Sequence, residues 1–366
     1  MLYNISERNG GKMITEEWKM DAKRLPGNPA LPQNTPALLL NIETTGLYAR
    51  SSFVYMAGAA WPQDGSFQVR ILLAHSRRDE PLLLDELHKL LLRHPAVYTY
   101  GGRSFSYQYL NERYANYHEG ILIAGNQMGN DLQKRTAPYR EVIGLPDMKK
   151  LTAEAAAGFQ RSGIREGARL IEVYEAWERS HEEADSETLL THCREDMYSL
   201  AWLLPMASFS DFFSGKAGKP QIDDEGSCLR LDFASEIAFP WDVSWTGAYA
   251  DIALHAHEAG VRLPVREGRL RYFLSGPCRD YYYLPEEDQA VHKSVAAFVD
   301  RNYRRRATPD TLYVPQDGRF VQLPPEILDG YRVFRESRKD RRGYIRTEDM
   351  DAQLAVKMLP YIAKKA

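Results

Sequence analysis

The stretch LLLNIETTGL at residues 38–47 decides the fold that we expect for this chain. An apolar run leads into Asn41 and Glu43, and a Thr-Thr-Gly-Leu turn follows. Side chains alternate between the two faces of a β-strand, so residues two apart share a face. The stretch therefore predicts a buried strand whose last residues carry an amide and a carboxylate on the same side.

Two further motifs follow the first one along the chain. They are TYGGRSFS at residues 99–106 and HCRED at residues 192–196, the latter within a helix predicted over Glu187–Leu204. In this order the three segments resemble the Asp-x-Glu, Asn-Gly-x-x-Phe-Asp and His/Tyr-Asn-x-x-Asp motifs of the YprB-like ribonuclease-H-like proteins, a branch of the DnaQ-type 3′→5′ exonucleases. The segments between them are also similar, so the resemblance covers residues 37–206.

The resemblance implies a site in which four carboxylates hold two Mg²⁺ or Mn²⁺ ions. Glu43 and Asp196 match two of these metal-binding carboxylates, and His192 matches the general base of the family. Asn41 and Ser106 stand where the family has aspartates, so these two are degenerate ligand positions. The positions that match substrate-binding residues of the family are Thr44, Gly46, Leu47 and Phe105.

The two missing carboxylates change the chemistry that such a site can perform. Hard divalent cations prefer charged oxygen ligands, and two of them bring four positive charges. Glu43 and Asp196 supply two negative charges, so we expect weak or absent metal binding and impaired catalysis. Asp131 is a candidate replacement carboxylate, although it matches a non-ligand aspartate of the family.

Composition and charge limit the remaining classes of function. The chain has 366 residues, 44% of them hydrophobic, and a net charge of -3, which indicates folded domains and excludes a protein that coats nucleic acid through overall positive charge. Its three cysteines have no metal-binding spacing and suit a reducing cytoplasm. We find no apolar leader and no apolar run long enough to span a bilayer, so we expect a cytoplasmic protein without membrane contact.

Changes in composition along the chain predict four segments. Residues 1–36 are polar, contain four prolines and are interpreted as a flexible lead. Residues 37–213 alternate strands and helices in the order of a ribonuclease-H-like mixed sheet with flanking helices, an α/β fold. Residues 214–226 predict a linker, and the short apolar runs of residues 227–366 predict a smaller β-rich α+β domain of unknown role. This last segment resembles an extension found beside the domain in some bacterial proteins.

The run Arg304, Arg305 and Arg306 is a candidate nucleic-acid contact. A structural explanation is also open, because a helix predicted over Glu286–Arg305 would end here and its C-terminal dipole favours cations. Three consecutive tyrosines at 281–283 either offer stacking faces for bases or pack in a sheet. The sequence leaves both pairs of alternatives open.

Three functions are compatible with these observations. The leading hypothesis is a nucleic-acid-binding protein whose exonuclease-type domain accepts a single-stranded 3′ end of DNA or RNA with little or no catalysis. The second is an active, metal-dependent 3′→5′ exonuclease with a modified metal site. The third is a module that binds a protein partner, which the acidic balance and the lost ligands allow. Metal binding distinguishes the first two, and nucleic-acid binding distinguishes the third from both.

Overall fold

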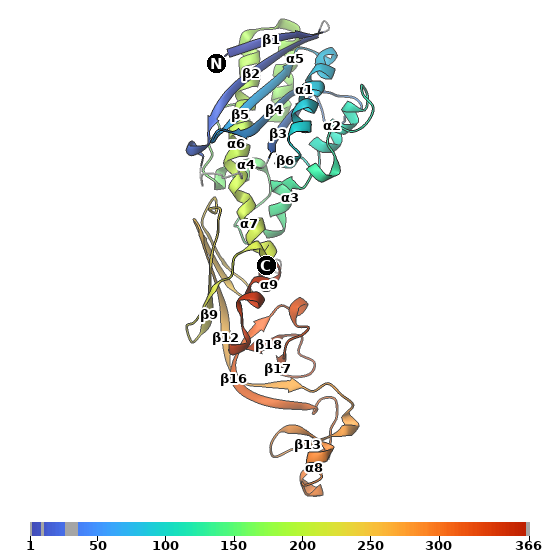
Figure 1. Ribbon diagram of the computed structural model, residues 1–366, viewed down its shortest axis with the longest axis vertical. Coiled ribbons are helices and arrows are strands. Elements are labelled where there is room, and N and C mark those ends of the chain that lie inside the picture. Colours follow the sequence, from blue (N-terminus) through green and yellow to red (C-terminus); the bar gives the residue numbers. More distant parts are fainter. Residues whose placement is uncertain (1, 9–10, 26–35, 364–366) are drawn as a thin grey trace. The chain divides into compact units, whose positions relative to one another are not determined.

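The computed structural model describes residues 2–8, 11–25 and 36–363 of the chain. The chain falls into two compact units, whose elements are labelled in Figure 1. Unit 1 extends to Ser210 and takes in Ile237–Trp241, and unit 2 comprises Asp211–Glu236 and Asp242–Ala366. The motifs that resemble an exonuclease therefore all lie in unit 1.

Unit 1 is built on a mixed sheet of seven strands in the order β1-β2-β5-β4-β3-β6-β7. Strand β6 runs parallel to β3 and to β7, whereas the other neighbours are antiparallel. The mixed sheet confirms the fold class predicted for this part of the chain. The strands are β1 (Leu2–Arg8), β2 (Gly11–Asp21), β3 (Ala37–Thr44), β4 (Val54–Gln63), β5 (Ser66–Ala74), β6 (Ala96–Thr99) and β7 (Asn130–Asp131).

Helices cover both faces of this sheet (Figure 1). Leu72 of β5 belongs to the buried cluster formed with α1 and α2, whereas Ile71 and Leu73 belong to the cluster formed with α5 and α6, as the alternation of a strand requires. None of the helices in the described residues is both long and apolar enough to cross a bilayer. The α-helices up to the boundary between the units are α1 (Glu80–Arg93), α2 (Ser106–Tyr114), α3 (Leu132–Thr136), α4 (Lys150–Ala156), α5 (Gly167–Ser180), α6 (Glu183–Leu203) and α7 (Ala207–Asp211).

The N-terminal segment differs from the flexible lead predicted for residues 1–36. Strands β1 and β2 form a hairpin, and β2 pairs with β5. Glu16 of β2 is fully buried and accepts two hydrogen bonds from Arg194 of α6, each at 2.8 Å. A strand ladder and a buried ion pair thus override the polar composition on which the prediction rested. Residues 26–35, with three of the four prolines, lie outside the described residues.

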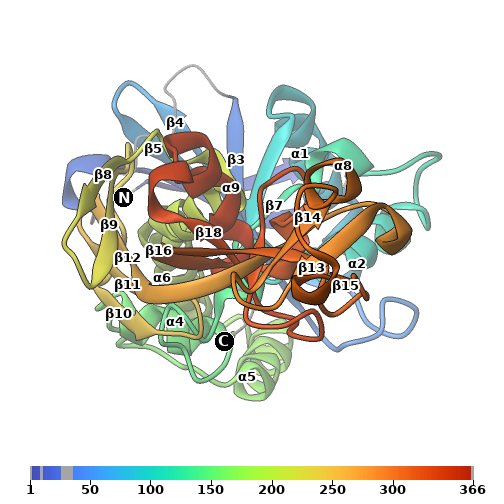
Figure 2. The ribbon, with the colours of Figure 1, turned by 90° about the horizontal axis from the view of Figure 1, so that it is seen from below.

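Unit 2 is rich in antiparallel strands, which confirms the second part of the predicted fold class. Its main sheet has the order β10-β11-β12-β16-β18-β17, and β8 and β9 join it through β12. Figure 2 shows β8, β9, β12, β11 and β10 in succession along this sheet. The strands are β8 (Gln221–Asp224), β9 (Cys228–Ala234), β10 (Val243–Thr246), β11 (Asp251–His255), β12 (Glu258–Phe273), β13 (Tyr281–Leu284), β14 (Gln289–His292), β15 (Arg305–Arg306), β16 (Tyr313–Leu323), β17 (Phe334–Arg335) and β18 (Gly343–Arg346), with helices α8 (Lys293–Ala296) and α9 (Ala352–Ile362).

Two predictions for this half of the chain differ from the structure. The linker expected at residues 214–226 contains β8, which pairs with β9 and is part of the sheet. The helix expected over Glu286–Arg305 is wrong, because this segment forms β14, the short α8 and β15 instead. Asp288 adopts a left-handed φ of 51° in the turn between β13 and β14, so the chain reverses there and residues 289–292 pair with β13. Pairing with β13 therefore overrides the helical spacing of the apolar residues.

A buried ion pair in unit 1 holds the loop that follows β3. Glu80 at the start of α1 is fully buried and accepts a hydrogen bond from Nε of Arg113 at 2.9 Å. The same carboxylate accepts the backbone N–H of Val54 at 2.8 Å. Arg113 in turn donates to the carbonyl oxygen of Ala49 at 2.8 Å. The pair therefore ties α1 and α2 to the middle of the connection between β3 and β4 and to the start of β4.

We predict that Arg113→Met lowers the free energy of unfolding of unit 1 by about 3–5 kcal/mol, because it leaves the Glu80 carboxylate buried without its counter-charge. Arg50→Met is the control, since Arg50 pairs with Glu112 at the surface and its side chain is 93% exposed. Loss of such an exposed pair costs about 0–1 kcal/mol. Chemical denaturation measures both values, and equal losses in the two variants would contradict the anchoring role of Arg113.

Candidate functional site

Helix α6 packs closely against the sheet because β4 has a glycine at the contact. Gly58 pairs with Asn41 in the β3–β4 ladder. A Cβ atom at Gly58 would lie 2.5 Å from Sδ of Met197 and 2.9 Å from Sγ of Cys193, both on α6. The glycine therefore permits an approach that brings the polar side chains of α6 to the end of β3.

Four of the residues predicted for the site come together here. A carboxylate oxygen of Glu43, one of Asp196 and a ring nitrogen of His192 lie within 4.8 Å of one another. Nδ2 of Asn41 donates to Oε1 of Glu43 at 3.2 Å and to Oδ2 of Asp196 at 2.8 Å. The amide at position 41 thus presents a nitrogen donor, rather than a metal-binding oxygen, to both carboxylates.

The imidazole of His192 is held between backbone and carboxylates. Its Nδ1 donates to the carbonyl oxygen of Ile164 at 2.9 Å, while its Nε2 lies 3.2 Å from Oδ2 of Asp196 and 3.5 Å from Oε1 of Glu43. Burial alone would lower the pKa of His192, but the hydrogen bonds and charges of Asp196 and Glu43 raise it to about 10. His192 is therefore a cation at neutral pH, whereas the general base implied by the resemblance needs a neutral ring.

Two more cations contact Asp196 from the connection between α3 and α5. Nζ of Lys150 donates to Oδ1 of Asp196 at 2.7 Å, and Nη2 of Arg161 donates to the same oxygen at 2.5 Å. The Asp196 side chain is 7% exposed, that of Arg161 4% and that of Lys150 21%. Burial alone would raise the pKa of Asp196, but the charges of Lys150, His192 and Arg161 hold it well below its ordinary value.

The loop that carries Arg161 is fixed by its neighbours. Glu195 of α6 accepts the backbone N–H groups of Ser162 and Gly163 at 2.7 and 3.1 Å. A Cβ atom at Gly163 would lie 3.0 Å from Oε2 of Glu195, a tight contact that the glycine avoids. Burial alone would raise the pKa of Glu195, but the hydrogen bonds from Ser162 and Gly163 lower it. The loop therefore holds Arg161 in one position.

A third carboxylate completes the charge network. Glu154 of α4 is buried and accepts hydrogen bonds from Nε and Nη2 of Arg161 at 2.7 and 2.5 Å. The hydroxyl of Ser199 on α6 donates to the same carboxylate. Arg161 thus lies between two buried carboxylates, Glu154 and Asp196, and compensates part of the charge of each.

The groups present do not fit a pair of divalent cations. Three carboxylates face three side-chain cations, so the formal charge of the cluster is zero with His192 protonated. Its members are Glu43, Glu154, Asp196, Lys150, Arg161 and His192. Divalent cations gain most from carboxylates that are not otherwise compensated. Two of them would add four positive charges to a largely buried cluster that is already neutral.

Ser106 and Asp131, two further residues that the sequence suggested as ligand positions, do not belong to the cluster of Glu43, His192 and Asp196. Ser106 is the first residue of α2, and no hydrogen bond in the described part of the chain joins it to Glu43, His192 or Asp196. Asp131 accepts the backbone N–H groups at positions 101 and 103, at 2.9 and 2.7 Å, and forms the N-cap of α3. Asp131 therefore has a structural role in the turn after β6, and we find no geometry that makes it a replacement ligand.

A hollow of about 410 Å³ lies beside the turn after β3. Leu47, Tyr48, Phe105 and Tyr109 give it apolar walls. Leu47 and Tyr48 are each 76% exposed, so both side chains are accessible to a ligand. The hydroxyl of Thr44 donates to the carbonyl oxygen of residue 46 at 2.9 Å and fixes the turn that carries these side chains. The residues predicted to bind substrate therefore lie in and around one hollow.

The arginines predicted to contact nucleic acid lie in the three-stranded sheet of unit 2 or directly before its last strand. Arg304 donates to the carbonyl oxygen of Ala296, the last residue of α8, and its guanidinium lies 5.0 Å from the ring centre of Tyr282. Arg305 and Arg306 form β15 and are exposed. Arg304 thus has a structural role at a helix end, although the helix is much shorter than predicted.

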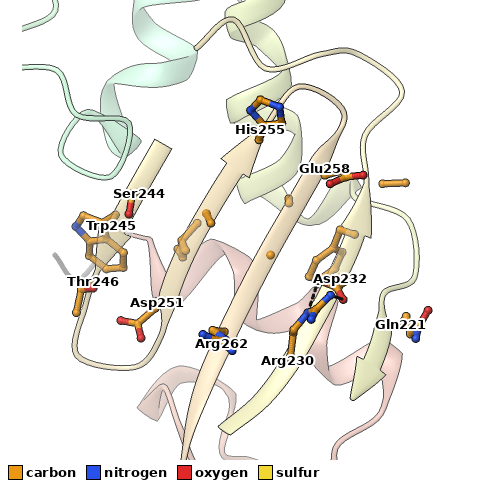
Figure 3. A pocket seen from close by; sticks show the side chains of 16 residues that line it. Gln221, Arg230, Asp232, Ser244, Trp245, Thr246, Asp251, His255, Glu258 and Arg262 are labelled. Carbon is orange, nitrogen blue, oxygen red and sulfur yellow. Dashed lines mark hydrogen bonds and ion pairs between the residues drawn. The ribbon is translucent and has the colours of Figure 1, made fainter. Parts of the chain in front are cut away.

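Unit 2 also has an open hollow of about 830 Å³ on the face of its sheet (Figure 3). The small residues Ser244, Ala253 and Gly260 lie opposite one another on three adjacent strands within it. Arg230 and Asp232 form an ion pair of 2.7 Å at its side. Among the described residues the one group spaced to hold a metal ion lies in unit 1, so this hollow has no comparable set of ligands.

Sequence reasoning did not identify Lys150, Glu154 and Arg161 as members of the site. Lys150 and Arg161 are 46 and 35 positions from Asp196 and belong to a short helix and a loop. A charged residue in such a segment is usually solvated, so the sequence has no signal that distinguishes these two from surface residues. The contact with Asp196 depends on tertiary packing.

Comparison with known protein families agrees with the fold of unit 1. Residues 38–207 match the model of the RNase H superfamily, somewhat less than half of the chain. Among solved structures, one titled "ExoI/SSB-Ct complex" is similar to this chain with 10% sequence identity and a TM-score of 0.29. The similarity covers 77% of this chain and 65% of that chain, so this protein spans less than two thirds of its length. No curated protein matches the sequence.

The raised pKa of His192 predicts a pH dependence of stability. Since its pKa in the folded protein is about 10 and its ordinary value is 6.5, protonated His192 stabilises the fold fully below about pH 6.5. This contribution is lost as the pH rises towards 10. The difference in unfolding free energy between the parent and His192→Gln should therefore decrease over this range. A difference in unfolding free energy that does not change with pH over this range would contradict the raised pKa of His192.

Proposed function

We propose that the protein binds the 3′ end of single-stranded nucleic acid through unit 1 and has little or no nuclease activity. The RNase H superfamily match of residues 38–207 supports a nuclease-type fold. The observation that carries the proposal is the direction of the Asn41 amide, whose nitrogen donates to both Glu43 and Asp196. A two-metal nuclease needs oxygen ligands at this point, because the metal ions activate the water and stabilise the leaving oxygen.

The hollow beside β3 supports the nucleic-acid part of the proposal. Its apolar walls at Leu47, Tyr48 and Phe105 suit the flat face of a base, and their position next to the turn at Thr44 and Gly46 matches the substrate-binding positions of the resembled family. Stacking and apolar contact with bases do not depend on base identity. The proposed ligand is therefore a strand end of either DNA or RNA.

One observation favours the alternative of an active exonuclease. Glu43, His192 and Asp196 are close enough to hold a metal ion. In that alternative a Mg²⁺ or Mn²⁺ ion would bind at Glu43 and Asp196 and would displace the side-chain cations from Asp196. The neutral charge of the cluster favours the inactive form. A protein-interaction module is the remaining outcome, and absence of nucleic-acid binding would indicate it.

The exposed arginines of β15 are a further part of the proposal. Arg305 and Arg306 are exposed on adjacent positions of an edge strand, so both guanidinium groups are accessible to phosphates. The proposal does not include Arg304, whose guanidinium already donates to the carbonyl oxygen of Ala296 and lies over the ring of Tyr282.

We predict that the purified protein degrades single-stranded DNA and RNA in Mg²⁺ or Mn²⁺ more slowly than a four-carboxylate member of the resembled family, by a factor on the order of 10⁴ or more. Loss of one member of a catalytic unit costs about this much. Exonuclease assays on end-labelled substrates measure the rate. Rapid metal-dependent trimming that disappears in both Glu43→Gln and Asp196→Asn would contradict the proposal and establish the active alternative.

A second prediction concerns the hollow beside β3. Leu47→Ala should weaken the binding of a single-stranded oligonucleotide by about 1–2 kcal/mol, since it removes apolar contact area from the wall of the hollow. Leu92→Ala is the matched control, because Leu92 is 73% exposed on α1 and takes no part in the hollow. Fluorescence anisotropy measures both affinities. Equal affinities for the two variants would remove this hollow from the binding surface.

A further inference from the structure

We infer that Lys150 and Arg161 replace divalent cations at Asp196, so that this pocket binds a phosphodiester of single-stranded nucleic acid without a metal ion. The inference rests on the proposed function for the identity of the ligand. The replacement of metal by side-chain cations follows from the contacts of Asp196 itself, and the two parts can be tested separately.

The carboxylate of Asp196 has no acceptor site left for a metal ion. A carboxylate offers about four lone-pair sites on its two oxygens. Oδ1 accepts from Lys150 and Arg161 at 2.7 and 2.5 Å. Oδ2 accepts from Asn41 at 2.8 Å and lies 3.2 Å from Nε2 of His192. A metal ion would therefore have to displace one of four side chains, and among these Lys150 and Arg161 are cationic.

Among the four partners of Asp196, Arg161 is the one that a metal ion would displace least readily. Its side chain is 4% exposed and also forms the two-point contact with Glu154, whose side chain is 3% exposed. Removing Arg161 would leave two buried carboxylates without their shared counter-charge, which is strongly unfavourable. The backbone N–H groups of the residues that follow Arg161 also donate hydrogen bonds to Glu195. The position of the Arg161 side chain is thus fixed by the fold, and a metal ion could displace it only at a high energetic cost.

Lys150 is the cation that a ligand can reach. Its side chain is 21% exposed, compared with 4% for Arg161 and 8% for His192. An ammonium group has three hydrogens, and one of them bonds to Asp196, so two remain for an acceptor at the solvent side. Lysine binds phosphate as a point charge and needs no fixed orientation of the ligand. We therefore assign to Lys150 the contact with a phosphodiester oxygen.

Metal-free binding is tested with the full chain and a labelled single-stranded oligothymidylate. Fluorescence anisotropy should give the same affinity in EDTA as in Mg²⁺ at matched ionic strength. Lys150→Met should lower the affinity roughly tenfold or more, since a charge-assisted hydrogen bond is lost. Lys150→Arg, which keeps a cation, should retain most of the affinity. The neighbouring Lys149→Met is the matched control, because Lys149 is 80% exposed and makes no contact with Asp196.

The replacement of metal is tested by thermal unfolding with and without Mn²⁺. The melting temperature of the parent should not respond to Mn²⁺, whereas that of Lys150→Met should rise with Mn²⁺ concentration, because one acceptor site of Asp196 is then open. Lys149→Met should behave like the parent.

Each outcome decides one part of the inference. A parent protein that binds the oligonucleotide only with Mg²⁺, or whose melting temperature rises with Mn²⁺, would overturn it. Unchanged affinity in Lys150→Met would overturn the phosphate contact. Absence of oligonucleotide binding under all conditions would refute the proposed function, while the unfolding experiment would still decide whether side-chain cations replace the metal. The measurements on the parent protein decide the inference even where Lys150→Met fails to fold.

Discussion

The site depends on the compensation of one buried charge, the carboxylate of Asp196. A buried carboxylate is stable only when its oxygens are bonded to donors and its charge is balanced. Here the donors come from β3, α4, the loop before α5 and α6, so one carboxylate links β3 and α6 to the connection that precedes α5. The same contacts that stabilise the fold also fill the positions at which a metal ion would bind. Under the proposed function, the stability of the pocket and the loss of metal chemistry therefore have one physical cause.

This network requires a frame that holds β3 and α6 at a short distance. Gly58 permits the contact, because any side chain there would overlap with Met197 and Cys193. On the other face of the sheet, the buried pair of Glu80 and Arg113 fixes the turn after β3. The polar network, the glycine contact and the buried pair thus specify one arrangement of the strand end. A hollow with exposed apolar walls beside this end is consequently a preformed surface rather than one that must assemble on binding.

The part of the site that could be predicted from the sequence is the part carried by local patterns. Asn41 and Glu43 follow an apolar run, and His192 and Asp196 are one helical turn apart, so spacing alone places each pair on one face. The cations Lys150 and Arg161 have no such pattern, because their contact with Asp196 arises from packing between segments. The helix expected over residues 286–305 was wrong for a related reason: periodicity describes one segment, whereas pairing with β13 decides its structure.

Asn41 consequently has a role beyond the absence of a carboxylate at its position. Its Nδ2 lies 3.2 and 2.8 Å from the oxygens of Glu43 and Asp196, and an aspartate here would place a third negative charge at about these distances. Like charges so close raise one another's pKa and destabilise the ionised pair unless cations intervene. In this protein Lys150 and Arg161 already balance Asp196, so the amide at position 41 completes a neutral set. Restoring an aspartate alone would leave excess negative charge, and removing the two cations alone would leave buried carboxylates uncompensated. The three positions therefore act as a unit, and substitutions among them should be non-additive.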